Sequence, residues 1–540
     1  MRRFTWRNML SGMLAGCMLC GLCGCGKTEQ TISEEVAEGV PAWQQYADTP
    51  VTLDWYVNYS WFTSGWGENL VSKQITEETG VTVNFITPKG SEEEALNNLM
   101  ISDSLPDLIT LGWWEAQANA LVKSDMVYAL NELADEYDMY FYEVADPTVV
   151  DWYTQEDGNI YGYPNSSYTP QDVDGTYEVG SNQTFLVRKD IYEAIGSPDM
   201  STIEGFSDAV KKATQMYPEV DGEPLIPIGA HVFDDMGCVS FDKYLMNFLA
   251  VPNEENGAYY DRFTDPEYIR WLKAFRRLHQ EGYIADCVFT DTRTQMSEKI
   301  AQGRYFCMLY QRTDMADQEK LLYDKNPDRI YIAVDGPRNS KGDNPILPTN
   351  GIRGWTLTMI SKSCKHPDRA IAFMDYMMSE HGQKMISLGV EGEMYDVVDG
   401  EYVIHDDVLE ALNTDREAYN KLYGADDTYW MLQDNAMQLQ WAPKLAEPLR
   451  QLEEWTYPYT RYQGQYEYFI SGDTPLGVTE AKINTLWSNT LPKLLLADSD
   501  EAFDRILADY VTERDALGYA ELAAEKTRQL TVNKQRLNME

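Results

Sequence analysis

The chain has 540 residues, of which 44% are hydrophobic and 12% aromatic, and its formal net charge at pH 7 is −43. This length allows two or three domains, and this composition is that of a globular protein rather than a disordered one. A surface this acidic repels nucleic acid and anionic lipid and disfavours an anionic substrate, although a local basic pocket stays compatible with it.

The first 24 residues have the features of a secretory signal peptide. A short apolar run over residues 9–24 follows three basic residues, Arg2, Arg3 and Arg7. The run is shorter than the roughly 20 apolar residues that a membrane-spanning helix needs, and polar chain follows it. We therefore predict a signal peptide over residues 1–24 and export of the remaining chain.

Cys25 resembles the acylated cysteine of a bacterial lipobox, because Leu22 and a small residue precede it. Cys17 is a second match, but it would leave an apolar run of only about eight residues. We predict a lipid at Cys25, which anchors the protein to the outer face of the cell membrane, and a flexible tether over residues 25–48. The alternative is a secreted protein without lipid.

Strands and helices alternate in the first part of the exported chain. β-Branched and aromatic residues predict strands over residues 51–57, 81–86 and 108–111. A helix is predicted to end near Gly80, and Ser91 with the glutamates after it predicts the start of another. This alternation indicates βαβ units and an α/β fold with a mostly parallel sheet. Near the C-terminus, apolar spacing predicts helices over residues 479–491 and 499–517.

Two loops of this region are candidates for ligand binding, because ligands of α/β sheets bind beyond the carboxyl ends of strands. The loop after the first predicted strand carries Tyr59, Trp61 and Trp66, and the loop after the third carries Trp113 and Glu115. Aromatic rings offer flat apolar platforms, and carboxylates accept hydrogen bonds from hydroxyl groups. This combination predicts a carbohydrate site; the alternative for each ring is ordinary packing in the core.

Seven short segments, in this order, resemble those of bacterial extracellular solute-binding proteins of family 1. They are ETGVTV (78–83), SDSLPDL (102–108), DGNIYGYP (157–164), FLVRKD (185–190), EKIAQGR (298–304), SKSCKHP (361–367) and GVEGEMY (389–395). Each segment alone is a weak match, but their common order is specific, and the resemblance extends over residues 50–530.

The resemblance implies a two-lobe, periplasmic-binding-protein-like clamp of type II, whose chain crosses the hinge several times. The first lobe is expected at 49–178 and 352–432, and the second at 179–351 and 433–536. The implied function is that of a monomeric, extracytoplasmic binding protein. It would capture an oligosaccharide and deliver it to the permease of an ABC importer. A peptide-binding lipoprotein of an importer and a secreted glycan-active enzyme are the alternatives.

The same topology places further residues near the cleft. The expected set is Tyr310 and Asp314 on the second lobe, Arg353 and Trp355 at the return crossing, and Glu391 and Tyr395 in the GVEGEMY segment. A salt bridge at the hinge is the equal alternative for the first pair. Trp430 and Trp441 are expected to lie in the core.

Neither a metal nor another cofactor is predicted. Some relatives carry a calcium loop of the DxNxNG type, but residues 217–223 retain only three carboxylates, Glu219, Asp221 and Glu223, whereas calcium takes about six or more oxygen ligands. The five histidines include no HExxH motif, and no catalytic signature is present, so we expect a binding protein rather than an enzyme. Four cysteines, Cys238, Cys287, Cys307 and Cys364, are either disulfide-bonded or free core residues.

Overall fold

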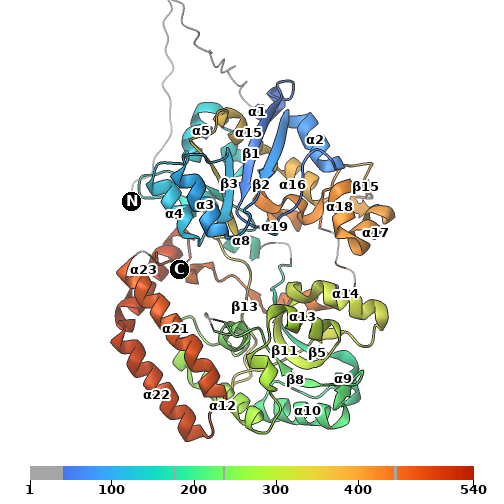
Figure 1. Ribbon diagram of the computed structural model, residues 1–540, viewed down its shortest axis with the longest axis vertical. Helices are drawn as coiled ribbons and strands as arrows, with labels where there is room; N and C mark the ends of the chain where they lie inside the picture. The colour runs from blue at the N-terminus through green and yellow to red at the C-terminus, as the bar shows by residue number, and fades with distance from the viewer. Residues whose placement is uncertain are drawn as a thin grey trace, which may run out of the picture.

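The computed structural model describes residues 40–539 except 174, 176, 177, 235, 236, 443, 444, 446 and 473. These residues form two α/β lobes, one above the other in Figure 1, and each lobe has its own sheet and its own core. The predicted signal peptide, Cys25 and most of the predicted tether lie outside the described residues. Among the helices described, none is long and apolar enough to cross a membrane.

The first lobe is built on a five-stranded sheet in the order β2-β1-β3-β14-β4. Its parallel part confirms the three predicted strands: β1 (Val51–Val57), β2 (Val81–Ile86) and β3 (Leu108–Gly112). The antiparallel part comes from distant chain, β4 (Tyr163–Pro164) and β14 (Thr356–Ile360). Every residue of β3 and β14 is buried, since helices cover both faces of the sheet at its centre.

The helices of the first lobe begin at capped positions. The Asn69 side chain accepts a hydrogen bond from the backbone N–H of Ser72, and the Ser91 hydroxyl accepts one from that of Glu94, as predicted for Ser91. The helices are α1 (Ala42–Gln45), α2 (Leu70–Thr79), α3 (Glu92–Ile101), α4 (Ala116–Lys123), α5 (Leu130–Tyr137), α6 (Phe141–Val144), α7 (Pro147–Tyr153), α8 (Pro170–Val173), α15 (Pro367–Met378), α16 (Glu380–Ser387), α17 (Asp406–Thr414), α18 (Arg416–Leu422) and α19 (Asn435–Gln438). A hairpin of β15 (Tyr395–Val398) and β16 (Glu401–Ile404) follows α16.

The second lobe is built on a four-stranded sheet, β12 (Tyr331–Ala333), β5 (Gln183–Arg188), β11 (Tyr305–Gln311) and β8 (Ile226–Gly229), in that order. β11 is parallel to β8 and antiparallel to β5. The helices are α9 (Lys189–Ala194), α10 (Ile203–Met216), α11 (Leu245–Phe248), α12 (Pro266–Gln280), α13 (Arg293–Ala301), α14 (Ala316–Lys325), α20 (Leu449–Glu454), α21 (Pro475–Leu495), α22 (Asp500–Ala516) and α23 (Tyr519–Arg536). α21 contains the helix predicted over residues 479–491, and α22 matches the one predicted over residues 499–517 to within one residue at each end.

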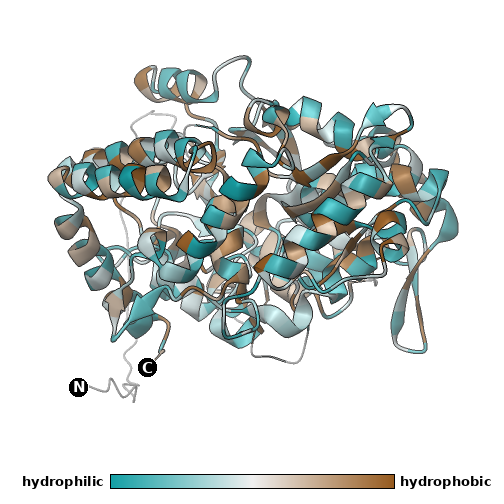
Figure 2. Cartoon of the chain, turned by 90° about the horizontal axis from the view of Figure 1, so that it is seen from below, coloured by the Kyte–Doolittle hydropathy of each residue, from teal (hydrophilic) through white to brown (hydrophobic). Residues whose placement is uncertain are grey.

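The outer helices of both lobes are amphipathic. Figure 2 shows hydrophilic and hydrophobic residues alternating along them, as helical periodicity produces on a surface helix. In α12 the buried residues include Tyr268, Trp271, Leu272 and Phe275, which occupy the core of the second lobe.

The chain passes between the lobes after α8, after β12 and after α19, which confirms a hinge crossed several times. Between the lobes, β13 (Leu347–Pro348) pairs in parallel with β17 (Thr460–Arg461). The guanidinium of Arg312 donates hydrogen bonds to the Ser181 carbonyl at 2.9 Å and to the Glu453 carboxylate at 2.6 Å, and so ties two crossings together.

One segment differs from the lobe assignment that the sequence predicts. Residues 433–442 were assigned to the second lobe, but they pack on the first: Gln383 of α16 accepts a hydrogen bond from the backbone N–H of Asp434 at 2.8 Å, and Trp441 packs with Leu388. α23 belongs to the second lobe, but its end also contacts the first, where Arg536 donates a hydrogen bond to the carbonyl of Trp152. Sequence periodicity identifies such helices but does not say which lobe they contact.

Candidate ligand-binding cleft

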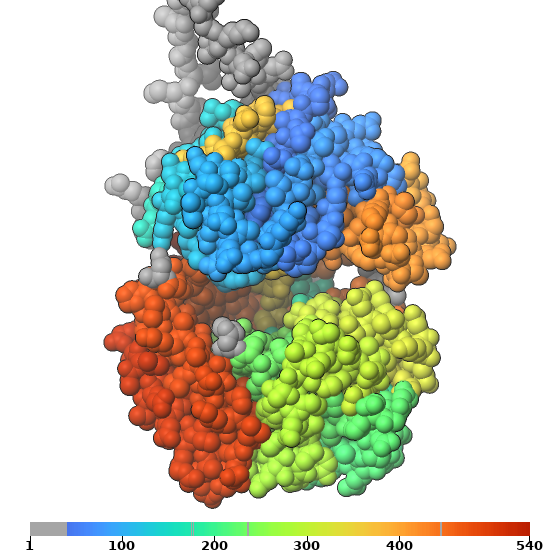
Figure 3. Space-filling view, in the orientation of Figure 1, coloured from blue at the N-terminus to red at the C-terminus, as the bar shows by residue number. Residues whose placement is uncertain are grey.

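A hollow separates the two lobes in the space-filling view (Figure 3). The carboxyl ends of β1 and β3 lie at this side of the first lobe, since Trp113, which follows β3, reaches Phe469 across the interface at a ring distance of 6.2 Å. In the second lobe, Gln311 ends β11 and pairs with Gln183, which starts β5 next to the hinge. Strand ends of both sheets therefore border the hollow, where ligands of α/β sheets bind.

Four aromatic rings gather where β1 and β14 reach this hollow; we refer to Tyr59, Trp61, Trp355 and Trp430 as the aromatic platform. Trp61 lies nearly parallel to Trp355, with an interplanar angle of 6° and 6.1 Å between ring centroids. Trp430 contacts both rings, with its centroid 5.7 Å from that of Trp61 and 4.5 Å from that of Trp355. Tyr59 and Trp430 are buried, whereas Trp61 is 55% exposed. The platform therefore presents one open indole on a rigid aromatic base.

A line of hydrogen bonds holds the loop that carries Trp61. Glu115 accepts from the side-chain amide of Asn58 at 2.5 Å and from the backbone N–H of Gly112 at 2.6 Å. Glu92 accepts from both the backbone N–H and the hydroxyl of Ser60, at 2.7 and 2.9 Å. Burial raises the pKa of Glu115 despite these two hydrogen bonds. Two carboxylates thus flank the platform and fix its geometry.

Trp66, predicted together with Trp61, lies in a different environment. Its indole N–H donates to the Thr76 hydroxyl at 2.9 Å, and its half-buried ring packs against Phe85, Phe373 and Tyr429 in the core of the first lobe. The structure does not bring Trp66 into the platform.

Trp113 and Arg353 stack on each other beside the platform. The Arg353 guanidinium lies 4.9 Å from the centre of the Trp113 ring and 5.4 Å from the rings of Trp152 and Phe469. The backbone N–H of Arg353 donates to Glu467, and burial lowers the pKa of the Arg353 guanidinium. Arg353 therefore holds Trp113 against the C-terminal segment through cation–π contacts rather than projecting as a free cation.

The opposite wall belongs to the second lobe. Tyr310 is fully buried and stacks on His231 at 4.2 Å, while Asp314 pairs with Arg293 of the same lobe at 2.7 Å. Desolvation and the nearby charge of Arg293 lower the pKa of His231 to about 3, so this ring is neutral at physiological pH.

Glu391 and Tyr395 line a separate cavity of about 620 Å³ on the first lobe, between α2 and α16. Their neighbours there include Glu78, His381 and Lys384. These neighbours belong to no part of the platform, so the structure separates the GVEGEMY segment from Trp61.

Several residues of the site were not among those predicted. Asn58 directly follows the strand β1, and this position at the carboxyl end of a strand could have identified it. Trp430 was expected in the core, and most of its ring does lie there. Glu92 and His231 gave no local signal, because only the packing of α3 and of the loop after β8 brings them to the hollow.

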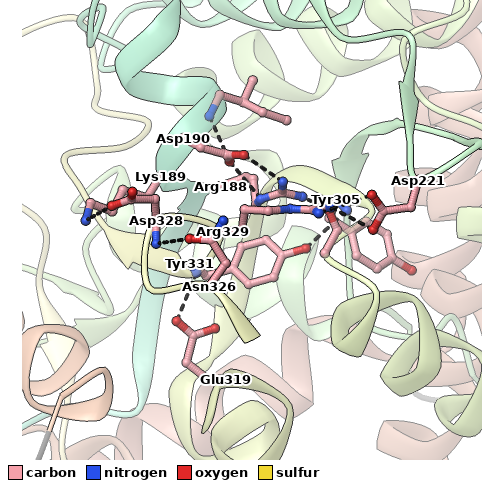
Figure 4. A network of polar contacts seen from close by, with 12 residues as sticks. Arg188, Lys189, Asp190, Asp221, Tyr305, Glu319, Asn326, Asp328, Arg329 and Tyr331 are labelled. Atoms are coloured by element: carbon pink, nitrogen blue, oxygen red, sulfur yellow. Dashed lines mark hydrogen bonds and ion pairs between the residues drawn. The ribbon is translucent and has the colours of Figure 1, made fainter. Parts of the chain in front are cut away.

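The loop that corresponds to a calcium site in some relatives is held by arginine (Figure 4). Arg329 donates two hydrogen bonds to the carboxylate of Asp221, at 3.1 and 2.8 Å, and Arg304 lies 3.6 Å from Glu223. With Arg329 on both oxygens of Asp221 and Arg304 beside Glu223, the loop offers far fewer free oxygens than the six or more that calcium takes, so these residues do not fit calcium. Within the described parts of the chain, no group of three or more His, Cys, Asp or Glu side chains could hold a metal ion.

The four cysteines considered above are free thiols. Cys238, Cys307 and Cys364 are buried, and Cys287 is half-buried. Of the two alternatives left open by the sequence, the structure therefore has the free core cysteines.

Comparison with known proteins places this architecture in a family. A profile described as bacterial extracellular solute-binding protein matches residues 71–390. Lipoprotein LipO of Bacillus subtilis (strain 168) is 22% identical over 341 residues, which cover 61% of this chain and 64%, less than two thirds, of LipO. The polygalacturonan/rhamnogalacturonan-binding protein YtcQ of the same strain is 20% identical over 414 residues, covering 76% of this chain and 78% of YtcQ.

Solved structures share the fold at low identity. The alginate-binding protein AlgQ2, in a crystal structure without calcium ion, superposes with a TM-score of 0.64 at 20% identity, covering 90% of this chain and 98% of AlgQ2. FusA of S. pneumoniae, solved with kestose, has a TM-score of 0.65 at 15% identity, covering 90% of this chain and 100% of FusA. Because the family profile covers more than half of its length, the chain belongs to the bacterial extracellular solute-binding protein family.

Proposed function

We propose that this protein captures an oligosaccharide between its lobes and delivers it to the permease of an ABC importer. Membership of the solute-binding family supports capture of a ligand outside the cell. The names of several relatives support a carbohydrate: YtcQ is named for polygalacturonan and rhamnogalacturonan, FusA was solved with kestose, and a Bifidobacterium longum infantis relative is described as HMO binding and ABC-transporter associated.

The observation that carries the proposal is the open indole of Trp61 on the aromatic platform. A pyranose or furanose ring has an apolar C–H face that stacks on such a surface, and its hydroxyl groups can donate to the carboxylates of Glu92 and Glu115. The tight packing of Trp61 on Trp355 and Trp430 means that little side-chain entropy is lost when a sugar binds.

A peptide is the second candidate ligand, because the aromatic side chains of a peptide can also stack on the platform. Thermal-shift measurements against matched panels of oligosaccharides and of peptides of three to six residues distinguish the two, since a ligand of the native state raises the melting temperature. We expect shifts with oligosaccharides. Shifts with peptides alone would refute the carbohydrate assignment.

The proposal includes no catalytic step. Recovery of the bound oligosaccharide, followed by chromatography and mass spectrometry, should return it intact after prolonged incubation. Release of shorter products by the purified protein would instead support the glycan-active enzyme.

The anchor at Cys25 is proposed from the lipobox and is consistent with the name of LipO. Cells that express the full chain and the Cys25→Ala variant should differ in labelled palmitate and in membrane fractionation. Palmitate on the variant would refute Cys25 as the anchor. We further propose a monomer, which size-exclusion chromatography with light scattering tests.

A further inference from the structure

Two carboxylates stand beside the open indole of the platform. Glu92 accepts a hydrogen bond from Ser60, the residue before Trp61, and Glu115 accepts one from Asn58, the first residue of the same loop. Burial and the negative charges of Glu115 and Glu92 together raise the pKa of the neighbouring Tyr59. A ligand stacked on Trp61 therefore lies in a field of negative charge.

The cations of the described walls offset this field only in part, because two are paired with carboxylates and the third is packed against aromatic rings. Arg293 pairs with Asp314 at 2.7 Å, and Arg312 pairs with Glu453 at 2.6 Å. Arg353 lies against the Trp113 ring and two further aromatic rings. His231 adds no charge, since it is neutral near pH 7. A bound anion would have to compete with a carboxylate for Arg293 or Arg312, or reach the Arg353 guanidinium among the aromatic rings that bury it.

The geometry points to a site that selects uncharged glycans and rejects uronate oligomers, with Glu92 as a specificity-determining residue. This inference rests on the proposed function and goes beyond it, because relatives of the same fold carry names that include alginate and polygalacturonan, both polyuronates. Shared fold at this low identity does not fix the ligand.

The physical reason is an asymmetry between hydroxyl groups and carboxylates. A sugar hydroxyl can donate a hydrogen bond to Glu92 or Glu115, so a neutral ring gains from both acceptors. A sugar carboxylate can only accept, so it would lose its water and meet like charge at the same position. The substitution of one CH₂OH by COO⁻ should thus reverse the sign of the electrostatic contribution.

Matched pairs of ligands test this inference directly. We would measure calorimetric affinities of the wild-type protein at about 0.15 M salt for gluco-, galacto- and manno-trisaccharides and for the trimers of the corresponding uronic acids. For each sugar whose neutral trimer binds, the uronate trimer should bind at least tenfold more weakly. A higher salt concentration should reduce this difference in affinity between neutral and uronate trimers, since it screens partly exposed charges.

Charge variants then identify the residue responsible. Glu92→Gln keeps an oxygen that can accept from Ser60 and removes the charge, so the ratio of uronate to neutral affinity should rise roughly threefold, the size of a partly screened interaction between single charges. Glu92→Lys should raise the ratio further. Glu93→Gln is the matched control, because it removes the same charge from an exposed position on the same turn of α3.

The outcomes separate this inference from the proposed function. Uronates that bind as tightly as their neutral partners, or a ratio that neither Glu92 variant changes while both remain folded by circular dichroism, would overturn the inference and leave carbohydrate capture standing. Binding of no neutral or acidic oligosaccharide in either panel would overturn the proposed function and the inference with it.

Discussion

Replacement of Trp61 or Trp66 by alanine should have opposite consequences, although both residues lie in one loop. Trp61 is 55% exposed on the platform, whereas Trp66 is half-buried and donates a hydrogen bond to Thr76. Trp61→Ala should weaken ligand binding with little change in the stability of the unliganded protein. Trp66→Ala should destabilise the first lobe and leave the affinity of the folded fraction close to normal.

The magnitudes follow from the exposed and buried surface. An aromatic side chain has about 200 Å² of surface to bury, and Trp61 is 55% exposed. If a sugar covers one of its two faces, it removes roughly 55 Å² from water, which contributes about 1.4 kcal/mol at 25 cal/mol per Å². A stacking contribution of about 0.5–1.5 kcal/mol brings the loss to about 2–3 kcal/mol, or about 30- to 150-fold in affinity. For Trp66, incomplete burial reduces the usual cost of a core Trp→Ala change to about 2–3 kcal/mol of unfolding free energy.

Titration calorimetry with an oligosaccharide identified by the thermal-shift screen measures the first quantity, and urea denaturation monitored by near-UV circular dichroism measures the second. The reasoning would be refuted if Trp61→Ala bound within threefold of wild type while Trp66→Ala lost affinity at unchanged stability. In that case the ligand would contact the loop on its other side.

Three further predictions concern the arginine-held loop, a histidine pair and the thiols. Calcium or a chelator should leave the melting temperature of the protein unchanged. Arg329→Ala should lower the free energy of unfolding by less than about 1 kcal/mol in denaturant titrations, because Asp221 is largely exposed. A calcium-dependent shift in the melting temperature of the wild type or of the variant would contradict the role of the guanidinium. The hydrogen bond to Glu78 raises the pKa of His381, so the stability it confers is complete below about pH 6.5 and is lost as pH rises through the folded pKa. The small difference in unfolding free energy between wild type and His381→Gln should therefore shrink from pH 6 to pH 8.5, and a constant difference would exclude this linkage. In protein that begins after Cys25, a thiol reagent should modify Cys287 first. It should modify Cys238, Cys307 and Cys364 only on unfolding, since these thiols are buried and burial raises their pKa values. Equal rates of modification for the four thiols would argue against the buried positions.

The local sequence predicted those parts of the fold that depend on near neighbours. Strands β1, β2 and β3 have the β-branched and aromatic residues of buried strands, and Ser91 caps α3 as its hydrogen-bonding side chain suggests. The family segments added the two-lobe arrangement, which periodicity alone could not provide. In contrast, neither source determined that residues 433–442 stay with the first lobe, because this depends on a contact with Gln383 about 50 residues away.

For the site, the sequence determined which residue types are present beyond β1 and β3: tryptophans, a tyrosine and a glutamate in loops where an α/β sheet binds its ligand. Only the tertiary structure decided that Trp61 is open and Trp66 packed, that Arg353 lies against aromatic rings, and that Trp355 and Trp430 join Trp61 from far along the chain. The physical reason is that the direction of a loop side chain, and the charge that surrounds it, are set by contacts with other segments, some near in sequence and some more than 200 residues away, on which local propensity carries no information.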